Sequence, residues 1–306
     1  MKTLRKKSTF TGSLSSKLKK KLTKFAPKVL SRHPSHSVLR GNLDLQPFRS
    51  IIRLGSTTTK ERAYEGRTID LNKVIEINTV QAIKNSASKL LMKQCFTREG
   101  VRTADWWSNR NGHFYKSDIT NLGNPTFITE LPYPIISKSL HGSRGEGNVK
   151  HDTQQQLEAW MRGKNLSNFI FEKYYNYSRE YRLHVTEDGC FYACRKMLRD
   201  GTPDSQRWFR NDSNSVWILQ ENASFDQPLN WNEIVTECVK ALRATTLDIA
   251  GFDVKVQSRL DGNGRVRTNP EFIVIESNSA CSHGDITTVK YKEELNKLLN
   301  SKKNNE

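Results

Sequence analysis

An apolar, β-branched stretch that ends in polar residues, FIVIESN at 272–278, is the feature that most constrains this chain. Its first four residues predict a buried strand. Because strand side chains alternate between faces, Glu276 and Asn278 then point the same way. A carboxylate in such a place is costly unless a positive group neutralises it. The stretch GFDVKV predicts a neighbouring strand that carries Asp253. The chain must therefore fold around a sheet whose strand ends gather acidic and amide oxygens.

Strand-like and helix-like patterns are interspersed along the rest of the chain from about Ser50. Strands are predicted in SIIRLGS, YPIISKS and NFIFEKYY, and a hairpin is predicted to turn on Asp188 and Gly189. Helices are predicted in SASKLLMKQCFTREG, in DTQQQLEAWMRG with Asp152 as N-cap, and in LNWNEIVTECVKALRATTL. The stretch VIEINTVQAI fits either a strand or a helix. This order, without an internal repeat, indicates an α+β or mixed α/β fold.

The net charge of +17 belongs mostly to the N-terminus, because residues 1–40 carry twelve Lys and Arg and no Asp or Glu. Leu14, Leu18, Leu22 and Phe25 have the spacing of a short amphipathic helix with a cationic face. Three interpretations are open: a disordered, solvated arm, a segment that contacts nucleic acid or an anionic surface, and an organelle transit peptide. The positive charge therefore belongs to this tail rather than to the body of the protein.

Hydrophobic residues make up 35% of the chain, and no stretch approaches the roughly 18 consecutive apolar residues of a membrane span. The five cysteines are scattered and odd in number, which argues against a disulfide framework and favours a reducing compartment. We therefore expect a soluble, cytoplasmic protein, with organelle targeting by the basic N-terminus as the alternative.

Asp253, Glu276 and Asn278 are candidate ligands of Mg²⁺ or Mn²⁺. Magnesium prefers carboxylate and amide oxygens and usually completes its shell with water and substrate phosphates. The metal would supply the positive charge that a buried Glu276 requires. The alternative is an ion pair between a carboxylate and Lys255 or an Arg near the strand end.

The stretch ISKSLHGSRGEG places Lys138 between an apolar strand and a loop with Gly142, Gly145 and Gly147. Glycines let backbone amides approach phosphate oxygens. A lysine at about 4 Å attracts a phosphate charge by ~4 kcal/mol at an effective dielectric of about 20. The sequence therefore offers a phosphate-binding loop, with a plain flexible turn as the alternative.

The stretch FIFEKYYNYSREYRLHV ends one strand in Glu172, Lys173 and Tyr174 and starts the next with Glu180 and Arg182 on a shared face. A strand edge with one carboxylate and free backbone groups can recognise the amino group and a ring nitrogen of adenine. A surface strand with charge pairs is the alternative.

Taken in order, these residues resemble the ATP-grasp superfamily. The series comprises Lys89, Lys138, Glu172, Glu180, Arg182, Arg195, Lys196, Asp253, Glu276 and Asn278. It is most similar to the carboxylate–amine ligases that add glutamate to a protein or peptide, and it extends over about residues 86–282. The segment WFRNDSN, with Phe209, Arg210 and Asn211, departs slightly from the Phe-x-x-Asn pattern of those ligases.

The resemblance implies roles for individual residues. The phosphates of ATP would be held by Lys89 and Lys138, with residues 143–147 as a lid that includes Ser143, Gly145 and Gly147. The adenine edge would be Glu172, Lys173 and Tyr174, and Glu180 would contact the ribose, with Arg182 as a further candidate for cofactor binding. The metal would be bound by Asp253, Glu276 and Asn278. The transferred phosphoryl group and the acyl-phosphate would be stabilised by Arg195, Lys196 and Arg210.

The resemblance also implies an α+β ATP-grasp fold in which two α+β subdomains grip ATP. The expected divisions are a basic, disordered tail (1–45), a reduced N-terminal α/β subdomain (46–105), a lid subdomain (106–166), a C-terminal subdomain (167–297) and a polar C-terminal tail (298–306). The implied activity joins a carboxylate to an amine through an acyl-phosphate, with an amino acid, peptide or protein as acceptor. The alternatives are a small-molecule kinase with the same ATP site, and a non-catalytic protein that binds ATP or nucleic acid.

Overall fold

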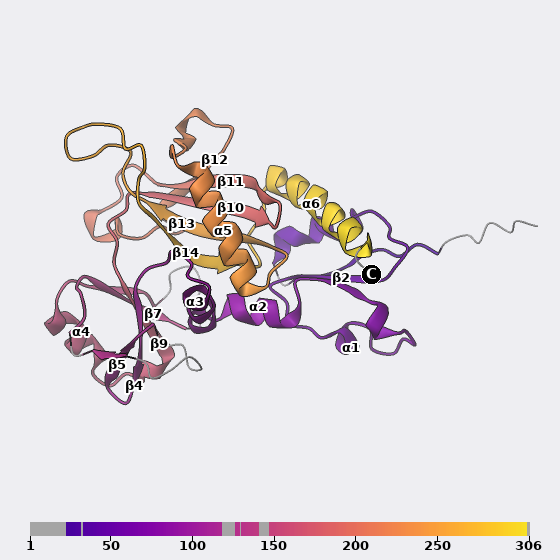
Figure 1. Ribbon diagram of the computed structural model, residues 1–306, viewed down its shortest axis with the longest axis horizontal. Coiled ribbons are helices and arrows are strands. Elements are labelled where there is room, and N and C mark those ends of the chain that lie inside the picture. The colour runs from indigo at the N-terminus through magenta and orange to yellow at the C-terminus, as the bar shows by residue number, and fades with distance from the viewer. Residues whose placement is uncertain (1–22, 32, 118–125, 129, 141–146, 305–306) are drawn as a thin grey trace, which may run out of the picture.

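The residues that the computed structural model describes, 23–31, 33–117, 126–128, 130–140 and 147–304, form three β-sheets with helices packed against them (Figure 1). Within these residues, no helix is both long enough and apolar enough to cross a membrane. The basic stretch before residue 23, with Leu14, Leu18 and Leu22 of the predicted amphipathic helix, lies outside them.

The first sheet is parallel, and its strands lie in the order β1 (Lys28–Ser31), β2 (Ser50–Leu54), β3 (Ile75–Ile77). Its connections contain the short helices η1 (Pro34–Leu39), α1 (Lys60–Ala63) and η2 (Leu71–Lys73). The C-terminal helix α6 (Asp285–Asn304) covers this sheet, because Leu295 and Leu299 are buried in one cluster with Ile52 and Ile77. The two ends of the described chain therefore share one core.

The second sheet is antiparallel and consists of six short strands. Their order is β6 (Thr126–Ile128), β5 (His113–Lys116), β4 (Trp106–Arg110), β9 (Phe169–Lys173), β7 (Ile135–Ser139), β8 (Val149–His151). Helices α4 (Gln154–Met161) and η3 (Leu166–Asn168) accompany it. Its core is small and aromatic, with Trp107 and Phe171 buried beside Leu157 of α4.

The third sheet is also antiparallel and has five strands, most of them longer than those of the second sheet. Its strand order is β12 (Ser215–Leu219), β11 (Gly189–Leu198), β10 (Arg179–Thr186), β13 (Ile249–Val256), β14 (Phe272–Asn278). One face packs against α2 (Val80–Ala87), α3 (Lys89–Arg98) and α5 (Trp231–Thr245). Two short helices, η4 (Asp204–Gln206) and η5 (Ala223–Phe225), lie in the connections around β12.

Alternation along these strands gives the five-stranded sheet one apolar face and one charged face. Tyr181, Leu183 and Phe252 are buried in the core beneath the helices. Arg182 lies between Tyr181 and Leu183, and Asp253 follows Phe252; both face the other side, where they pair with each other. The charged face is therefore built by the same strands that build the core.

A β-bulge at Ile275 brings Glu276 to the charged face. Val274 pairs with Val254 and lies in the core, whereas Glu276 pairs with Asp253, so Ile275 is left without a partner in the ladder. With strict alternation, Glu276 would share the face of Val274 and its carboxylate would point into the apolar core. One extra residue therefore decides where this carboxylate lies.

Most predicted elements are confirmed, with differences at helix ends. The expected helix in SASKLLMKQCFTREG is split between α2 and α3, because the side chain of Ser88 accepts a hydrogen bond from the amide of Leu91 and starts a new helix. The ambiguous stretch VIEINTVQAI contains both a strand, β3, and the start of α2. Thr153 rather than Asp152 is the N-cap of α4.

The structure corrects three of the expected divisions. The stretch before residue 46 contains β1 and η1, so residues 28–39 belong to the folded N-terminal sheet and not to a disordered tail. Strand β9 lies between β4 and β7, so residues 169–173 belong to the sheet expected for the lid. Helix α6 continues to Asn304 and buries Leu299, so the residues after 297 are mostly helical.

Candidate active site

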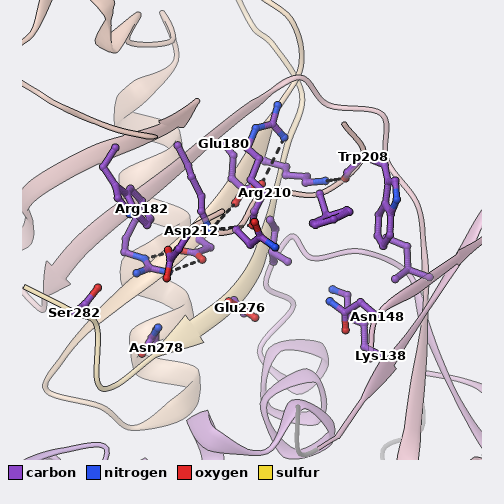
Figure 2. Close-up of a pocket in the computed structure, with 18 of the residues that line it drawn as sticks. Lys138, Asn148, Glu180, Arg182, Trp208, Arg210, Asp212, Glu276, Asn278 and Ser282 are labelled. Carbon is purple, nitrogen blue, oxygen red and sulfur yellow. Dashed lines mark hydrogen bonds and ion pairs between the residues drawn. The ribbon is translucent and has the colours of Figure 1, made fainter. Parts of the chain in front are cut away.

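A cavity of about 470 Å³ lies between the charged face of the five-stranded sheet and the second sheet (Figure 2). One wall carries charged and amide side chains from β10, β11, β13 and β14. The opposite wall contributes Lys138 of β7 and Asn148, which follows the loop after it. Figure 2 shows these two groups facing each other across the cavity. A ligand here would contact both subdomains at once.

The expected oxygen donors are brought together on neighbouring strands. Asp253 of β13 is directly opposite Glu276 of β14 in the ladder, and Asn278 lies two pairs further along, on the same face; all three line the cavity. Arg182 holds the Asp253 carboxylate through two hydrogen bonds, Nε to Oδ1 at 2.6 Å and an Nη to Oδ2 at 2.8 Å. The pairing of Asp253 with an arginine, weighed above as an alternative to metal binding, is thus present.

The two carboxylates have opposite electrostatic environments. Burial raises the pKa of Asp253, but attraction by Arg182 and Lys196 outweighs it and holds the pKa below its ordinary value. Burial and the neighbouring Asp253 raise the pKa of Glu276, which Lys138 and Arg182 only partly offset. The neighbouring cations therefore do not fully neutralise Glu276 in this arrangement, as expected at a site suited to one more cation.

The donor set fits a hard divalent cation in its chemistry. Two carboxylates and one amide are the oxygens that magnesium or manganese takes, with the remaining positions left for water and phosphate. Among the described residues, no group of three or more His, Cys, Asp or Glu side chains is placed to hold a metal ion. The amide of Asn278 would therefore be the third protein ligand of such a site.

Lys138 and a second, unpredicted lysine bind one buried carboxylate. The Lys138 ammonium lies 2.8 Å from Oε2 of Glu172, and the ammonium of Lys93, which is fully buried on α3, lies 3.5 Å from the same oxygen. Burial lowers the pKa of Lys93 to about 8, although Glu172 counteracts it. Lys89, one helical turn before Lys93, has its pKa lowered by burial and feels Glu276 and Glu172.

Strand β9 does not provide the free edge expected for adenine. It is an inner strand, and the amides of Lys173 and Tyr174 donate to the carbonyls of Asp105 and Pro134. The carboxylate of Glu172 is occupied by the lysines and is not part of the cavity wall. The structure thus corrects the adenine-edge expectation, because neighbouring strands and buried lysines already use these groups.

Glu180 connects the cations of the cavity. Its carboxylate lies 3.6 Å from an Nη of Arg210 and 4.0 Å from the ammonium of Lys196, and all three side chains line the cavity. Lys196 also donates to the backbone carbonyl of Arg210 at 3.0 Å. Lys255 completes this group, and burial lowers its pKa to about 8 against the attraction of Glu180.

Arg195 is the clearest misplacement among the predicted catalytic residues. It precedes Lys196 in β11, and because neighbouring strand residues face opposite sides, only Lys196 reaches the cavity. The guanidinium of Arg195 instead lies 3.4 Å from a carboxylate oxygen of Asp226 behind the sheet. Of the expected lid, Ser143 and Gly145 lie outside the described residues; Gly147 is described and has a positive φ of 73°.

Several residues of the cavity were not predicted from the sequence. They are aromatic or amide side chains and one histidine: Trp208, Phe209, Trp217, Asn148 and His33. Trp217 of β12 lies under two cations, 4.9 Å from the Arg182 guanidinium and 5.1 Å from the Lys196 ammonium. The alternation of side chains along β12 could have predicted that Trp217 faces the cavity. His33 could not be predicted in this way, because it comes from the stretch expected to be disordered.

No model of a known protein family matches the chain. A probable alpha-L-glutamate ligase from Alkalilimnicola ehrlichii is 25% identical over 220 residues, which cover 69% of this chain and 65% of that protein, so the chain spans about two thirds of the relative's length. The D-alanine–D-alanine ligase of Bacillus anthracis superposes with a TM-score of 0.54 at 12% identity and covers 88% of this chain and 90% of that chain. The ATP-grasp ligase PsnB, complexed with minimal precursor, gives a TM-score of 0.44 at 14% identity over 74% of this chain and 64% of that chain. The chain has the ATP-grasp fold of the α+β class and resembles ligases of that superfamily.

Proposed function

We propose that the protein is an ATP- and divalent-metal-dependent ligase that joins a carboxylate to an amine. One observation carries the proposal. A single cavity has the oxygens of Asp253, Glu276 and Asn278 on one wall and the ammonium of Lys138 on the other. The oxygens suit a metal ion bound to phosphate, and the ammonium suits the phosphates themselves.

Asp253, Glu276 and Asn278 would hold Mg²⁺, and the metal would neutralise charge on the phosphates of ATP. Lys138 and Lys89 would contact those phosphates from the other side. The raised pKa of Glu276 supports this role, because a bound cation would supply the charge that the site lacks.

The reaction balances in two steps. The γ-phosphoryl group of ATP passes to an oxygen of the substrate carboxylate, which gives an acyl-phosphate and ADP. The amine nitrogen then attacks the carbonyl carbon, phosphate leaves, and the nitrogen loses a proton to form the amide. Lys196 and Arg210 would stabilise the anionic acyl-phosphate, and Glu180 would orient them, since it contacts both.

Glutamate is the first substrate to test, because the sequence relative is described as a probable alpha-L-glutamate ligase. The assay supplies Mg-ATP, glutamate and a panel of amino acids and peptides, and it measures ADP, phosphate and the amide product. A ligase yields all three. A phosphorylated product without free phosphate would instead indicate a kinase.

Glu276→Gln should lower turnover by about 10²- to 10³-fold through the loss of one metal ligand and its charge. The fold should be at least as stable at neutral pH. A group whose pKa is raised in the folded state stabilises the fold at pH values below its unfolded pKa, and this stabilisation is lost as the pH rises through the folded pKa. Glu276 therefore does not stabilise the fold at neutral pH through its ionisation. The matched control is Glu187→Gln, whose carboxylate pairs with Arg243 on the surface. Equal activity of the two variants would refute the assignment of Glu276.

A further inference from the structure

A second, smaller cavity of about 150 Å³ lies outside this site. It is formed where three segments meet: the start of β10, the chain just after η5, and the long connection between β13 and β14, which projects from the sheet in Figure 1. Arg179, Arg259 and Arg267 line it, one from the first segment and two from the third. Leu229 and Val266 provide an apolar rim.

The carboxylate of Asp226 lies among these arginines. Asp226 is 3.6 Å from an Nη of Arg179, 3.4 Å from an Nη of Arg195 and 3.4 Å from an Nη of Arg259. With Arg267 the cluster holds four guanidinium groups, three of which line the cavity. Arg267 also attracts the carboxylate of Asp261 on the same connection, so the two carboxylates leave a surplus of two positive charges. Arginine remains charged at any physiological pH, so this surplus cannot be relieved by loss of a proton.

The cluster also contains buried donors that the described residues leave unused. The Nε atoms of Arg195 and Arg267 are buried and have no hydrogen-bond partner there. The side chain of Arg179 is 4% exposed, and its Nε donates to the carbonyl of Gln257 at 2.8 Å, which holds the guanidinium in place. Buried donors without acceptors are costly, and an anion in the cavity would offer an acceptor to Arg267, which lines it.

We propose that this cavity, which we call the arginine pocket (Arg179, Asp226, Arg259 and Arg267), is a binding site for one phosphoryl group. Guanidinium forks match the oxygens of a tetrahedral phosphate, and a group with two negative charges offsets most of the surplus. The volume accommodates a single phosphate group but not a nucleotide, because pockets for drug-sized ligands occupy about 300–1,000 Å³. The group comes either from free phosphate or from a small phosphomonoester.

The arginine pocket is separate from the candidate active site but shares two strands with it. Arg179 and Arg195 each precede a residue of the large cavity, Glu180 and Lys196. The sheet itself lies between the two sites. Occupancy of the arginine pocket is therefore independent of the proposed ligase activity and can be tested without it.

The test is thermal unfolding and calorimetry of the full chain with inorganic phosphate, and with phosphoserine as the phosphomonoester, against chloride at matched ionic strength. A tenfold excess of phosphate over its dissociation constant should raise the melting temperature by about 2–3 °C. Arg259→Gln and Arg267→Gln should each weaken phosphate binding about tenfold or more. Arg243→Gln, an exposed arginine paired with Glu187, is the matched control and should bind as the unaltered protein does.

Lys138→Gln identifies the cavity that binds, because phosphate could also enter the large cavity. Binding that survives Lys138→Gln and is lost in Arg259→Gln and Arg267→Gln supports the arginine pocket. The reverse pattern, or no phosphate-specific shift in any variant, overturns it. The proposal is also overturned if the arginine variants melt below the unaltered protein by the same amount with and without phosphate. The arginines would then only hold the β13–β14 connection in place. Tighter binding of phosphoserine than of phosphate identifies the phosphomonoester as the ligand.

Discussion

The face of the five-stranded sheet beneath α5 and the face toward Lys138 are made from the same strands, yet they are stabilised differently. On the first face, Tyr181 and Phe252 are buried among apolar side chains, and burial of apolar surface stabilises the fold. On the second, Arg182 and Asp253 are also buried, but as an ion pair. Such a pair contributes little net stability, since desolvation opposes attraction. The apolar face therefore stabilises the fold, whereas the charged face contributes little to stability and carries the residues of the proposed site.

Val274→Glu should have the largest effect on this comparison. Val274 pairs with Val254 and lies in the apolar core, so the substitution places a carboxylate without a partner on the apolar face, which costs several kcal/mol. We expect a protein that does not fold cooperatively, measured by near-UV circular dichroism and chemical unfolding. Val274→Ala is the control, because it removes side-chain volume without adding a charge. A Val274→Glu variant as stable as Val274→Ala would contradict the assignment of this face to folding.

Two substitutions, one on each face, should each lower the free energy of unfolding by about 3–5 kcal/mol. Phe252→Ala removes a fully buried ring from the apolar face and leaves a cavity. Arg182→Met leaves Asp253 buried and unpaired on the charged face. Urea unfolding measures both. The double variant Arg182→Met, Asp253→Leu should recover much of the stability lost by Arg182→Met, whereas activity should remain lost. No recovery would mean that the ion pair itself stabilises the fold.

Two neighbours in β11 test whether the faces divide function as well. Lys196→Gln should lower turnover by about 10²-fold, equivalent to about 3 kcal/mol, because Lys196 lines the large cavity. Arg195→Gln should change turnover by less than about threefold, since its guanidinium contacts Asp226 behind the sheet. The steady-state ligase assay measures both. A comparable loss in Arg195→Gln would contradict the separation of the faces.

The smallest expected effect concerns pH. Because burial lowers the pKa of Lys93 to about 8, the folded state binds fewer protons than the unfolded state between about pH 8 and pH 10.5. The free energy of unfolding of the protein relative to Lys93→Met should therefore rise across this window, by about 2–3 kcal/mol. Urea unfolding of both proteins at a series of pH values measures the difference. A constant difference would mean that Lys93 keeps its ordinary pKa in the fold.

The secondary structure of the central region was largely predictable, because its strands follow clear local patterns. GFDVKV and FIVIESN are apolar runs with polar ends, and they pair as predicted, with Asp253 opposite Glu276. The bulge was not predictable from local pattern. Both neighbours of Ile275 were expected in the same strand, and only the pairing with β13 shows where the alternation breaks.

Residues of the site that depend on tertiary contacts were harder to predict. Lys93 appears in the sequence as one of several helical cations, and only packing against Glu172 distinguishes it. Arg195 and Lys196 were given one role, although strand alternation separates adjacent residues. Glu172 was expected at a free edge because the sequence does not reveal that β4 and β7 flank its strand. Local periodicity therefore predicted the helices and strands well, but not which side chains and strands contact each other.

The position of α6 has a consequence for synthesis of the chain on the ribosome. The strands of the first sheet have all been synthesised once residue 77 has emerged, but Leu295 and Leu299, which pack on Ile52 and Ile77, follow only with α6. Until α6 has emerged, these strand residues lack part of their apolar cover. Truncation within α6 should therefore expose the sheet near the N-terminus, far away in sequence from the missing residues.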